Sequence, residues 1–536
     1  MNRLKSWLPF FVSVCFYAGL LSAALCRIYR LTHGSQLYLL DDTYIHLSIA
    51  KNLLLHGVYG ISASESAMAS SSIVWPFLLV VTGKVFGLSV FLPLVLNVIF
   101  ALALLAIALH VLRKNGVMSL ISQTLTLMLI VLAFPLIAMT LDGMEHILYG
   151  FAFILFLWVA GSVVGDGRDC GRLQKGWLLG SAILLTSCRY EGVFAVFIVC
   201  LLLVRRSLLL SAAVGSAGAA PVLIFGIFSR LHGGMWVPNS LVIKTLDHAS
   251  LFQKLITIPL SLSYLYYWQI GLSGTLLLLG LLAFLTRRGG LMNNQRSMLL
   301  IFLGTAVLHI QFARIQTATP RYESYLMGAA VLLASIVLIR LRHYEREQHK
   351  RLPLYLKILV VFAVMPLVIY RGVYWEVVAA NSAASIYRQQ YQAAQFFSRY
   401  YHGQPIVAND VGLVSYYADV QCFDLWGLGN NEVAYRVSKG TFTTAVIKRM
   451  ATQRNVRVGF LYANEFFGAQ SLPKDWLVVA TWTIPGERGN TARPTITFYA
   501  MTQKDAGTLL LNLREFQKDL PPGVKALTPN GLPITD

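Results

Sequence analysis

Residues 41–57, DDTYIHLSIAKNLLLHG, decide how the rest of the chain is interpreted. This stretch follows the first apolar segment of membrane length, and it begins with the adjacent carboxylates Asp41 and Asp42. In a helix of about 3.6 residues per turn, His46 lies one turn beyond Asp42, so acids, an imidazole and Lys51 share one short, partly apolar element. Capping the helix N-terminus requires only one acid. The second carboxylate at a membrane surface therefore indicates a functional role for at least one of the two.

The composition of the whole chain excludes a soluble enzyme. Hydrophobic residues make up 56% and charged residues 13% of the 536 residues, and the mean hydropathy is +0.61. Such values are typical of a multi-pass membrane protein. The first apolar segment, residues 7–26, is too long for the hydrophobic core of a secretory signal, and Leu25 does not fit a lipoprotein cleavage site. We therefore expect a retained helix.

Apolar runs that can cross about 30 Å of hydrocarbon predict about eleven transmembrane helices. After the first, they cover residues 89–112, 117–139, 147–165, 176–188, 193–204, 207–229, 267–286, 295–313, 323–340 and 353–371. Residues 73–86 form a shorter apolar run that contains Pro76 and Lys84. If this run lies along the outer surface, every Arg and Lys cluster falls in the cytoplasm, as the positive-inside rule requires. We therefore predict a cell-membrane protein with a cytoplasmic N-terminus and an extracytoplasmic C-terminal part.

This topology gathers acidic residues on one side of the membrane. Eight of the twelve Asp and Glu before residue 373 fall at outer loops or outer helix ends: Asp41, Asp42, Glu65, Asp142, Glu145, Glu191, Asp247 and Glu323. The basic residues Arg189, Lys244, Arg314 and Arg321 fall on the same side. Because charge is costly near hydrocarbon, charges contributed by several distant loops predict one polar site that faces the outer compartment.

Beyond about residue 372 the apolar runs shorten, and the other twelve of the 24 acids appear. This change predicts two domains, a membrane domain over 1–372 with amphipathic surface helices in its first outer loop and a soluble extracytoplasmic α/β domain over 373–536. Helical patterns cover 376–401, 431–453 and 503–518, and β-rich runs occur at 405–410, 456–462, 476–484 and 495–501.

Other classes of site find little support in the sequence. The six cysteines form no CxxC pair and no disulfide framework. Much of the formal charge of +20 lies in the predicted cytoplasmic loops, where it attracts anionic membrane lipids, so we expect no nucleic-acid partner. We find no nucleotide or metal motif and predict no cofactor, while dependence on a divalent metal stays open.

Six segments, in order along the chain, resemble motifs of the GT-C class of membrane glycosyltransferases. They are DDTYIHLSIAKNLLLHGVYG with ASSSIVW, LDGMEHILYG, RYEG, VPNSLVIK, TPRYESYLMG and NDVGLVSYYADVQCFDLWGLGN, which together extend from residue 41 to about residue 430. The resemblance is nearest to the bacterial group of the terminal arabinofuranosyltransferase. It is more distant to protein O-mannosyltransferases and to the transferase that adds aminoarabinose to lipid A. Three departures leave the sugar undefined: Ile73 where a proline is usual, Met68 where many relatives carry an acid, and Tyr190 in place of the proline of "RPEG".

The resemblance implies a hexosyl- or pentosyltransferase that uses a polyprenyl-phosphate sugar. Its acceptor would be an envelope glycan, a lipid or a protein. It assigns the general base to Asp41, sugar or acceptor binding to Asp42, and the role of companion acid to Glu145. The donor phosphate and the substrate would be bound by Arg189, Lys244, Arg321, His46, Asn239 and Tyr322. Positioned acids and cations of this kind are what glycosyl transfer from a phosphate requires.

Two alternatives from other classes stay open at this stage. A transporter or flippase of lipid-linked sugars would place ionisable residues near the middle of the membrane, whereas these charges gather at one face. A non-catalytic envelope-assembly protein would not need the paired acids Asp41 and Asp42 on its surface helix. A lipid-diphosphate donor is also possible, and such a leaving group usually recruits a divalent cation.

Overall fold

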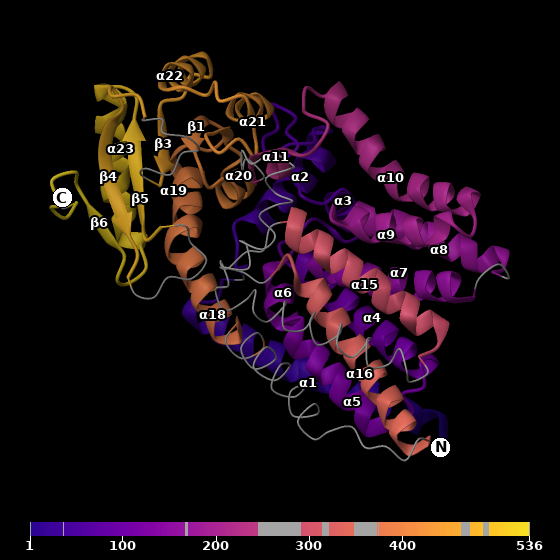
Figure 1. Ribbon diagram of the computed structural model, residues 1–536. Helices are drawn as coiled ribbons and strands as arrows, with labels where there is room; N and C mark the ends of the chain where they lie inside the picture. Colours follow the sequence, from indigo (N-terminus) through magenta and orange to yellow (C-terminus); the bar gives the residue numbers. More distant parts are fainter. Residues whose placement is uncertain are drawn as a thin grey trace.

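The computed structural model describes residues 2–35, 37–166, 170–244, 291–313, 321–347, 372, 375–462, 472–485 and 493–534. Two of the predicted spans, 267–286 and 353–371, lie outside these residues, as do Asp247 and Arg314. The described chain forms a helical bundle followed by an α/β sheet domain at the opposite end of the molecule from the N-terminus (Figure 1).

The bundle consists of apolar helices. They are α1 (Asn2–Leu31), α4 (Leu92–Lys114), α5 (Leu120–Ala133), α6 (Leu136–Asp142), α7 (His146–Asp166), α8 (Arg172–Cys188), α9 (Gly192–Val204), α10 (Leu208–Leu231), α15 (Asn293–Phe312) and α16 (Ser324–Glu347). Several of the closest contacts in the bundle join helices that are not neighbours in the chain, such as α1 with α5 and α7 with α15. Helix α7 lies at the centre, in contact with α4, α8, α15 and α16. Its residues and those of its neighbours form the main apolar core.

Four helices of the described chain are long and apolar enough to cross a membrane. They cover Lys5–Leu31, Leu92–Lys114, His146–Gly165 and Leu208–Leu231. The run predicted as one span over 117–139 is instead a pair, α5 and α6, bent by 44°. The break falls at Pro135, which has no backbone N–H to continue the hydrogen-bond ladder. Counting this pair as one span gives five, so the predicted number of eleven is not confirmed.

The first outer loop contains α2 (Asp42–His56) and α3 (Val74–Phe86). Helix α2 ends where Gly57 adopts a left-handed φ of +68° and its N–H bonds to the Asn52 carbonyl, a geometry that favours glycine. We expected α2 to be amphipathic, yet nine of its fifteen residues are buried. It packs against α3 and against α20 (Gly412–Ala418) of the C-terminal domain. Helix α3, by contrast, exposes Val81, Val85 and Phe86.

The chain enters the C-terminal domain through one continuous helical segment. It consists of α18 (Trp375–Ile386), a π-helical turn η4 (Tyr387–Tyr391) and α19 (Gln392–Tyr400), and α18 packs against α1. A π turn inserts an extra residue and redirects side chains, and it often occurs at functional positions. Here it directs Gln389 and Gln390 into the buried junction with the sheet.

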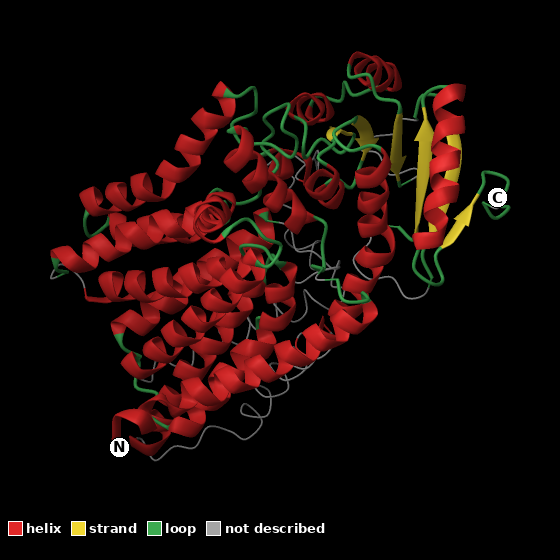
Figure 2. Cartoon of the chain, turned by 180° about the vertical axis from the view of Figure 1, so that it is seen from behind, coloured by secondary structure: helices red, strands yellow, loops and turns green. Residues whose placement is uncertain are grey.

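Six strands form one mixed sheet, seen from both sides in Figures 1 and 2. They are β1 (Pro405–Ala408), β2 (Gln421–Asp424), β3 (Val458–Leu461), β4 (Leu477–Thr483), β5 (Thr495–Ala500) and β6 (Lys525–Leu527), in the order β2-β1-β3-β5-β4-β6. Strand β1 is parallel to β2 and β3, and the remaining pairs are antiparallel. The helices of this domain are α20 (Gly412–Ala418), α21 (Asn431–Ser438), α22 (Thr444–Gln453), α23 (Gln503–Phe516) and the short η5 (Gln517–Asp519).

The sheet domain agrees closely with the sequence pattern. All four predicted β-rich runs contain strands, and the predicted helices are present, although 431–453 is divided by a turn around Gly440 with a left-handed φ of +67°. The prediction missed β2, β6 and α20, which are short. Residues of α2 and the loop before it share one apolar cluster with this domain, so the two parts of the chain are packed together. The predicted boundary at residue 372 stays a prediction.

Candidate functional site

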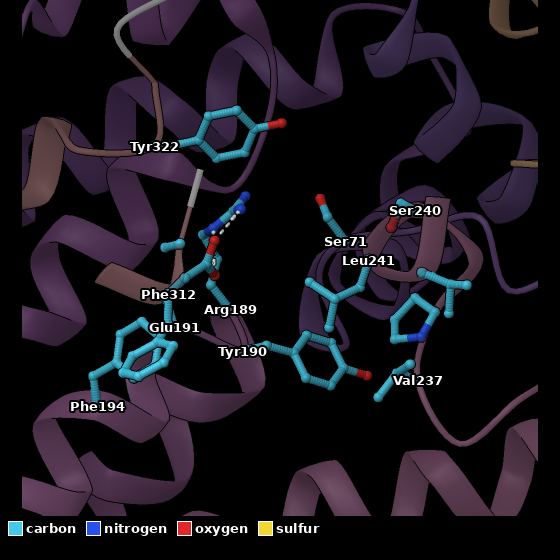
Figure 3. Close-up of a pocket in the computed structure, with 13 residues that line it drawn as sticks. Ser71, Arg189, Tyr190, Glu191, Phe194, Val237, Ser240, Leu241, Phe312 and Tyr322 are labelled. Atoms are coloured by element: carbon cyan, nitrogen blue, oxygen red, sulfur yellow. Dashed lines mark hydrogen bonds and ion pairs between the residues drawn. The ribbon is translucent and has the colours of Figure 1, made fainter. Parts of the chain in front are cut away.

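A cavity of about 540 Å³ opens between the loop after α8, the segment before α11 (Asn239–Lys244) and the end of α15. Most of its wall is apolar: Phe194, Val237, Pro238, Leu241, Val242, Phe312 and Ala313. Its polar wall contains Arg189, Glu191 and Tyr322 on one side and Ser71, Tyr190 and Ser240 further across (Figure 3). The cavity therefore offers a charged end to a ligand that is otherwise apolar.

Arg189 supplies the cation at this end. The RYEG segment forms the tight turn between α8 and α9, in which Arg189 is extended and Glu191 is the N-cap residue of α9. The guanidinium Nη2 donates to Glu191 at 2.8 Å, and Nη1 donates to Glu145 at 2.7 Å. Burial opposes the charge of Arg189, but the two carboxylates outweigh this effect and raise its pKa. Burial raises the pKa of Glu191, but Arg189 outweighs it, so the net pKa is lowered.

Glu145 lies at the start of α7 and is fully buried. Besides Arg189, its carboxylate accepts a hydrogen bond of 3.1 Å from Ser71 and lies 3.7 Å from His46 Nε2. The other ring nitrogen of His46 lies 3.2 Å from the Ser70 hydroxyl. The structure thus brings together the predicted site residues Glu145, Arg189 and His46. In this arrangement Glu145 orients Arg189.

A second ion pair lies beside the first. Arg321 Nη2 lies 2.9 Å from the carboxylate of Asp42, whose side chain is 28% exposed. Burial opposes the charge of Arg321, while Tyr322 and Asp42 favour it, and the net effect raises its pKa. The Tyr322 ring connects the two cations, because its centroid is 5.1 Å from the guanidinium carbon of Arg321 and 5.1 Å from that of Arg189. Two guanidinium groups therefore flank one aromatic ring at the cavity wall.

Asp41 occupies a different environment from Asp42. Its two carboxylate oxygens accept the backbone N–H groups of Gly412 at 2.5 Å and Leu413 at 2.7 Å, at the start of α20 in the C-terminal domain. The residue is only 7% exposed. Its predicted role as general base stays a prediction, but these contacts occupy both oxygens. Of the two adjacent acids, Asp42 is the one that faces the cations.

Other predicted residues contact the C-terminal domain. The side-chain amide of Asn239 donates to the Leu428 carbonyl at 3.1 Å and to Asn431 at 3.0 Å. Glu65 accepts two bonds of 3.0 Å from Arg454. Lys244 ends α11, but its side chain lies outside the part of the chain that the structure describes.

Roles for Ser70, Ser71 and Asp410 were not predicted from the sequence. The serines belong to the quoted ASSSIVW segment and Asp410 to NDVG, so the motifs contained the signal, although spacing alone gave these residues no role. The carboxyl group of Asp410 interacts with that of Asp41 across the junction of the two domains. Within the described ranges, no group of three or more His, Cys, Asp or Glu could hold a metal ion.

Comparison with solved structures identifies a shared fold. The structure of ArnT from Cupriavidus metallidurans bound to undecaprenyl phosphate matches with a TM-score of 0.51 and 11% identity, over 92% of this chain and 99% of that chain. The archaeal oligosaccharyltransferase AglB from Archaeoglobus fulgidus, in complex with an inhibitory peptide and a dolichol-phosphate, matches with a TM-score of 0.42 and 11% identity, over 96% of this chain and 75% of that chain. The likeness to ArnT shows that this chain has the same fold, a helical membrane part followed by an α/β domain.

Sequence comparisons add one family match. Residues 382–499 match the model of a domain of unknown function, DUF8728, which covers the segment from α18 to β5. A search of curated proteins found no match.

Proposed function

We propose that the chain is a GT-C membrane glycosyltransferase that moves a sugar from a polyprenyl-phosphate carrier to an acceptor at the outer face of the membrane. The ordered motifs support this assignment, and so does the fold shared with ArnT, whose solved structure contains undecaprenyl phosphate. The acceptor class that fits is an envelope glycan, a lipid or a protein, and the sugar is a hexose or a pentose.

One observation carries the proposal. Arg189 and Tyr322 line the charged end of an otherwise apolar cavity. On the same Tyr322 ring a second cation, Arg321, pairs with the carboxylate of Asp42. A polyprenyl phosphate has this same division, since its phosphate is anionic and its chain is hydrocarbon. The apolar wall would contact the chain, and the guanidinium groups would bind the phosphate by charge-assisted hydrogen bonds.

The chemistry then follows from the residues. The acceptor hydroxyl attacks the anomeric carbon of the donor, its proton passes to the Asp42 carboxylate, and the bond from the anomeric carbon to the phosphate oxygen breaks. The electron pair of that bond leaves with the polyprenyl phosphate. Arg321 and Arg189 stabilise the charge that develops on the leaving phosphate. A positioned base of this kind contributes about 10²- to 10⁴-fold to the rate.

The ion pair between Arg321 and Asp42 gives the reaction an order. While the guanidinium binds Asp42 at 2.9 Å, the carboxylate is occupied. A donor phosphate that binds Arg321 competes with Asp42 for the same N–H donors. The donor would therefore bind before the acceptor is activated.

The topology inferred from the basic loops supplies the rest of the proposal. The N-terminus would lie in the cytoplasm and the α/β domain, residues 373–536, outside the cell membrane. Membrane lipids surround the bundle over 1–372. A monophosphate leaving group can be stabilised by arginines alone, so the proposed reaction requires no divalent metal.

The test is transfer by the purified protein from a synthetic polyprenyl-phosphate sugar to an added acceptor, in detergent or liposomes, with chelator present. We expect transfer without a nucleotide sugar. Asp42→Asn should reduce turnover by about 10²-fold or more while donor binding is kept, since it removes the base and not the cations. Use of a nucleotide sugar but not lipid donors would contradict the donor assignment, and complete loss in chelator would favour a lipid diphosphate. Movement of the intact lipid-linked sugar across the liposome membrane, without transfer of the sugar to an acceptor, would indicate a transporter.

A further inference from the structure

Asp410 lies outside the cavity and is not used in the reaction described above. It follows the carboxyl end of strand β1, and its carboxyl group interacts with that of Asp41. Its oxygen Oδ2 also accepts bonds from Gln390 at 2.8 Å and from the Tyr462 hydroxyl at 3.0 Å. Gln390 belongs to the π turn η4, and Tyr462 follows β3. The entry helix, the sheet and the loop before α2 therefore meet at one carboxyl group.

The contact between the domains is close on both sides of this group. The carboxylate of Asp41 accepts the N–H groups of Gly412 and Leu413, so it caps the first turn of α20. A Cβ at Gly412 would collide with the Asp41 carbonyl and would lie 2.8 Å from its Oδ2. No larger residue fits without moving the backbone of Asp41. Asp42 is the next residue in the chain, so its position is fixed by the C-terminal domain.

We propose that Asp410 is a positioning residue that shares one proton with Asp41 and thereby holds the start of α2, and with it Asp42, in place beside Arg321. The inference rests on the proposed function, since it concerns the base of that reaction. It assigns to the C-terminal domain a part in completing the catalytic site.

The shared proton follows from the surroundings of the two acids. Two neighbouring buried carboxylates repel each other unless one of them is protonated. Burial, the largest effect, raises the pKa of Asp41, and its neighbour Asp410 raises it further. Together these outweigh the backbone N–H groups of Leu413 and Gly412, which lower it. Burial also raises the pKa of Asp410. The other ionisable groups that face the pair are Asp42 and Tyr44 on α2, Tyr462 after β3 and Cys422 on β2.

The sign of the pH effect follows from these raised pKa values. The unfolded chain loses the proton near the ordinary aspartate pKa of 3.8, while the folded pair retains it to higher pH. The contribution of the pair to stability therefore declines as the pH rises from that value to the raised pKa of the pair. At higher pH both acids are ionised, and the contact between the domains weakens.

Asp410→Asn separates the effect of the shared proton from the effect of the other hydrogen bonds of Asp410. The amide oxygen can accept from Gln390 and Tyr462, and the amide nitrogen can donate to Asp41 without a shared proton. The matched control is Asp419→Asn, which lies in the same junction but is exposed and pairs with Lys51 at 2.7 Å. The two measurements are the Tm and the turnover, each from about pH 5 to pH 9, on full-length protein.

We expect the difference in Tm between Asp410→Asn and wild type to increase by about 2 °C or more from about pH 5 to pH 9, in favour of the variant. The same difference for Asp419→Asn should not change with pH. The fall of turnover at alkaline pH should be present in wild type and in Asp419→Asn but weaker in Asp410→Asn. Asp410→Ala, which leaves Gln390 and Tyr462 without their acceptor, should lose about tenfold or more in turnover at every pH.

A Tm difference between Asp410→Asn and wild type that does not change with pH would overturn the shared proton. A pH-dependent Tm difference with identical pH profiles of turnover would overturn the positioning role. If no variant transfers sugar, the proposed function fails, and hydrogen exchange at residues 41–47 then decides the inference separately. Faster exchange at alkaline pH in wild type, but not in Asp410→Asn, supports it, and equal exchange in the two proteins contradicts it.

Discussion

The substitution Arg321→Gln tests the phosphate-binding cation of the proposed site. It removes the charge and leaves a neutral side chain that can still donate a hydrogen bond. In the resting protein the guanidinium lies 2.9 Å from the Asp42 carboxylate, an attraction of about 6 kcal/mol at an effective dielectric of about 20. Desolvation and the partial exposure of Asp42 reduce this, and a hydrogen bond to a charged group typically leaves about 1.5–3 kcal/mol net.

The effect on the reaction should exceed the effect on stability. The leaving phosphate gains charge as the bond to the sugar breaks, and losing one preorganised donor to such a charge costs about 10²- to 10³-fold in turnover. We expect Arg321→Gln to raise the KM for the lipid donor, to lower kcat by about that factor and to leave the KM for the acceptor nearly unchanged. The assay is steady-state transfer with each substrate varied in turn, together with binding of a polyprenyl phosphate.

The control is Arg399→Gln, because Arg399 is 48% exposed and pairs with Glu515 and Asp519 far from the cavity. It should leave all three constants unchanged. Wild-type kcat in Arg321→Gln, or a loss that appears only in the acceptor KM, would refute the assignment of Arg321 to the donor phosphate.

Three further predictions concern the junction between the domains. Gly412→Ala should destabilise the protein by about 1–3 kcal/mol, because a Cβ at this position has no room beside Asp41. Gly507→Ala, where nothing lies within 4 Å of the added Cβ, should instead stabilise α23 by about 0.5–1 kcal/mol. Equal melting curves for the two variants would contradict this. Asp41→Asn should cost about 1–3 kcal/mol, because an amide presents N–H to a backbone N–H, and an unchanged urea midpoint would argue against the cap. Arg454→Gln, which breaks a partly exposed pair with Glu65, should cost only about 0.2–1 kcal/mol and leave turnover at the wild-type level, so a large loss of turnover would place Glu65 in the site.

Much of the fold could be predicted from the sequence because it depends on local pattern. The apolar runs that gave α4, α7 and α10 are continuous, and the alternating β-rich runs contain β1, β3, β4 and β5. The bend between α5 and α6 was missed because the apolar run continues through Pro135, which interrupts the helix but not the hydropathy. The burial of α2 was missed for a related reason: the pattern of a helix does not reveal a second domain that covers it.

The candidate site was predicted in part. Glu145 and Arg189 come from distant loops and were brought together by a topology argument based on charge, and the structure places them 2.7 Å apart. The separate environments of Asp41 and Asp42 could not be predicted, since adjacent residues have the same pattern and only their contacts in the fold, Gly412 for Asp41 and Arg321 for Asp42, distinguish them. Asn239 shows the same limit, because its partner Asn431 is distant in the sequence and no periodicity connects the two.

The most direct test of the central claim is a density map of the protein with a bound polyprenyl phosphate. The proposed function predicts that the phosphate lies within hydrogen-bond distance of Arg321 and Arg189, beside Tyr322, with the first isoprene units in the cavity lined by Leu241 and Phe312. Asp42 should then have separated from Arg321. A phosphate bound elsewhere, with the ion pair between Asp42 and Arg321 intact, would contradict the claim.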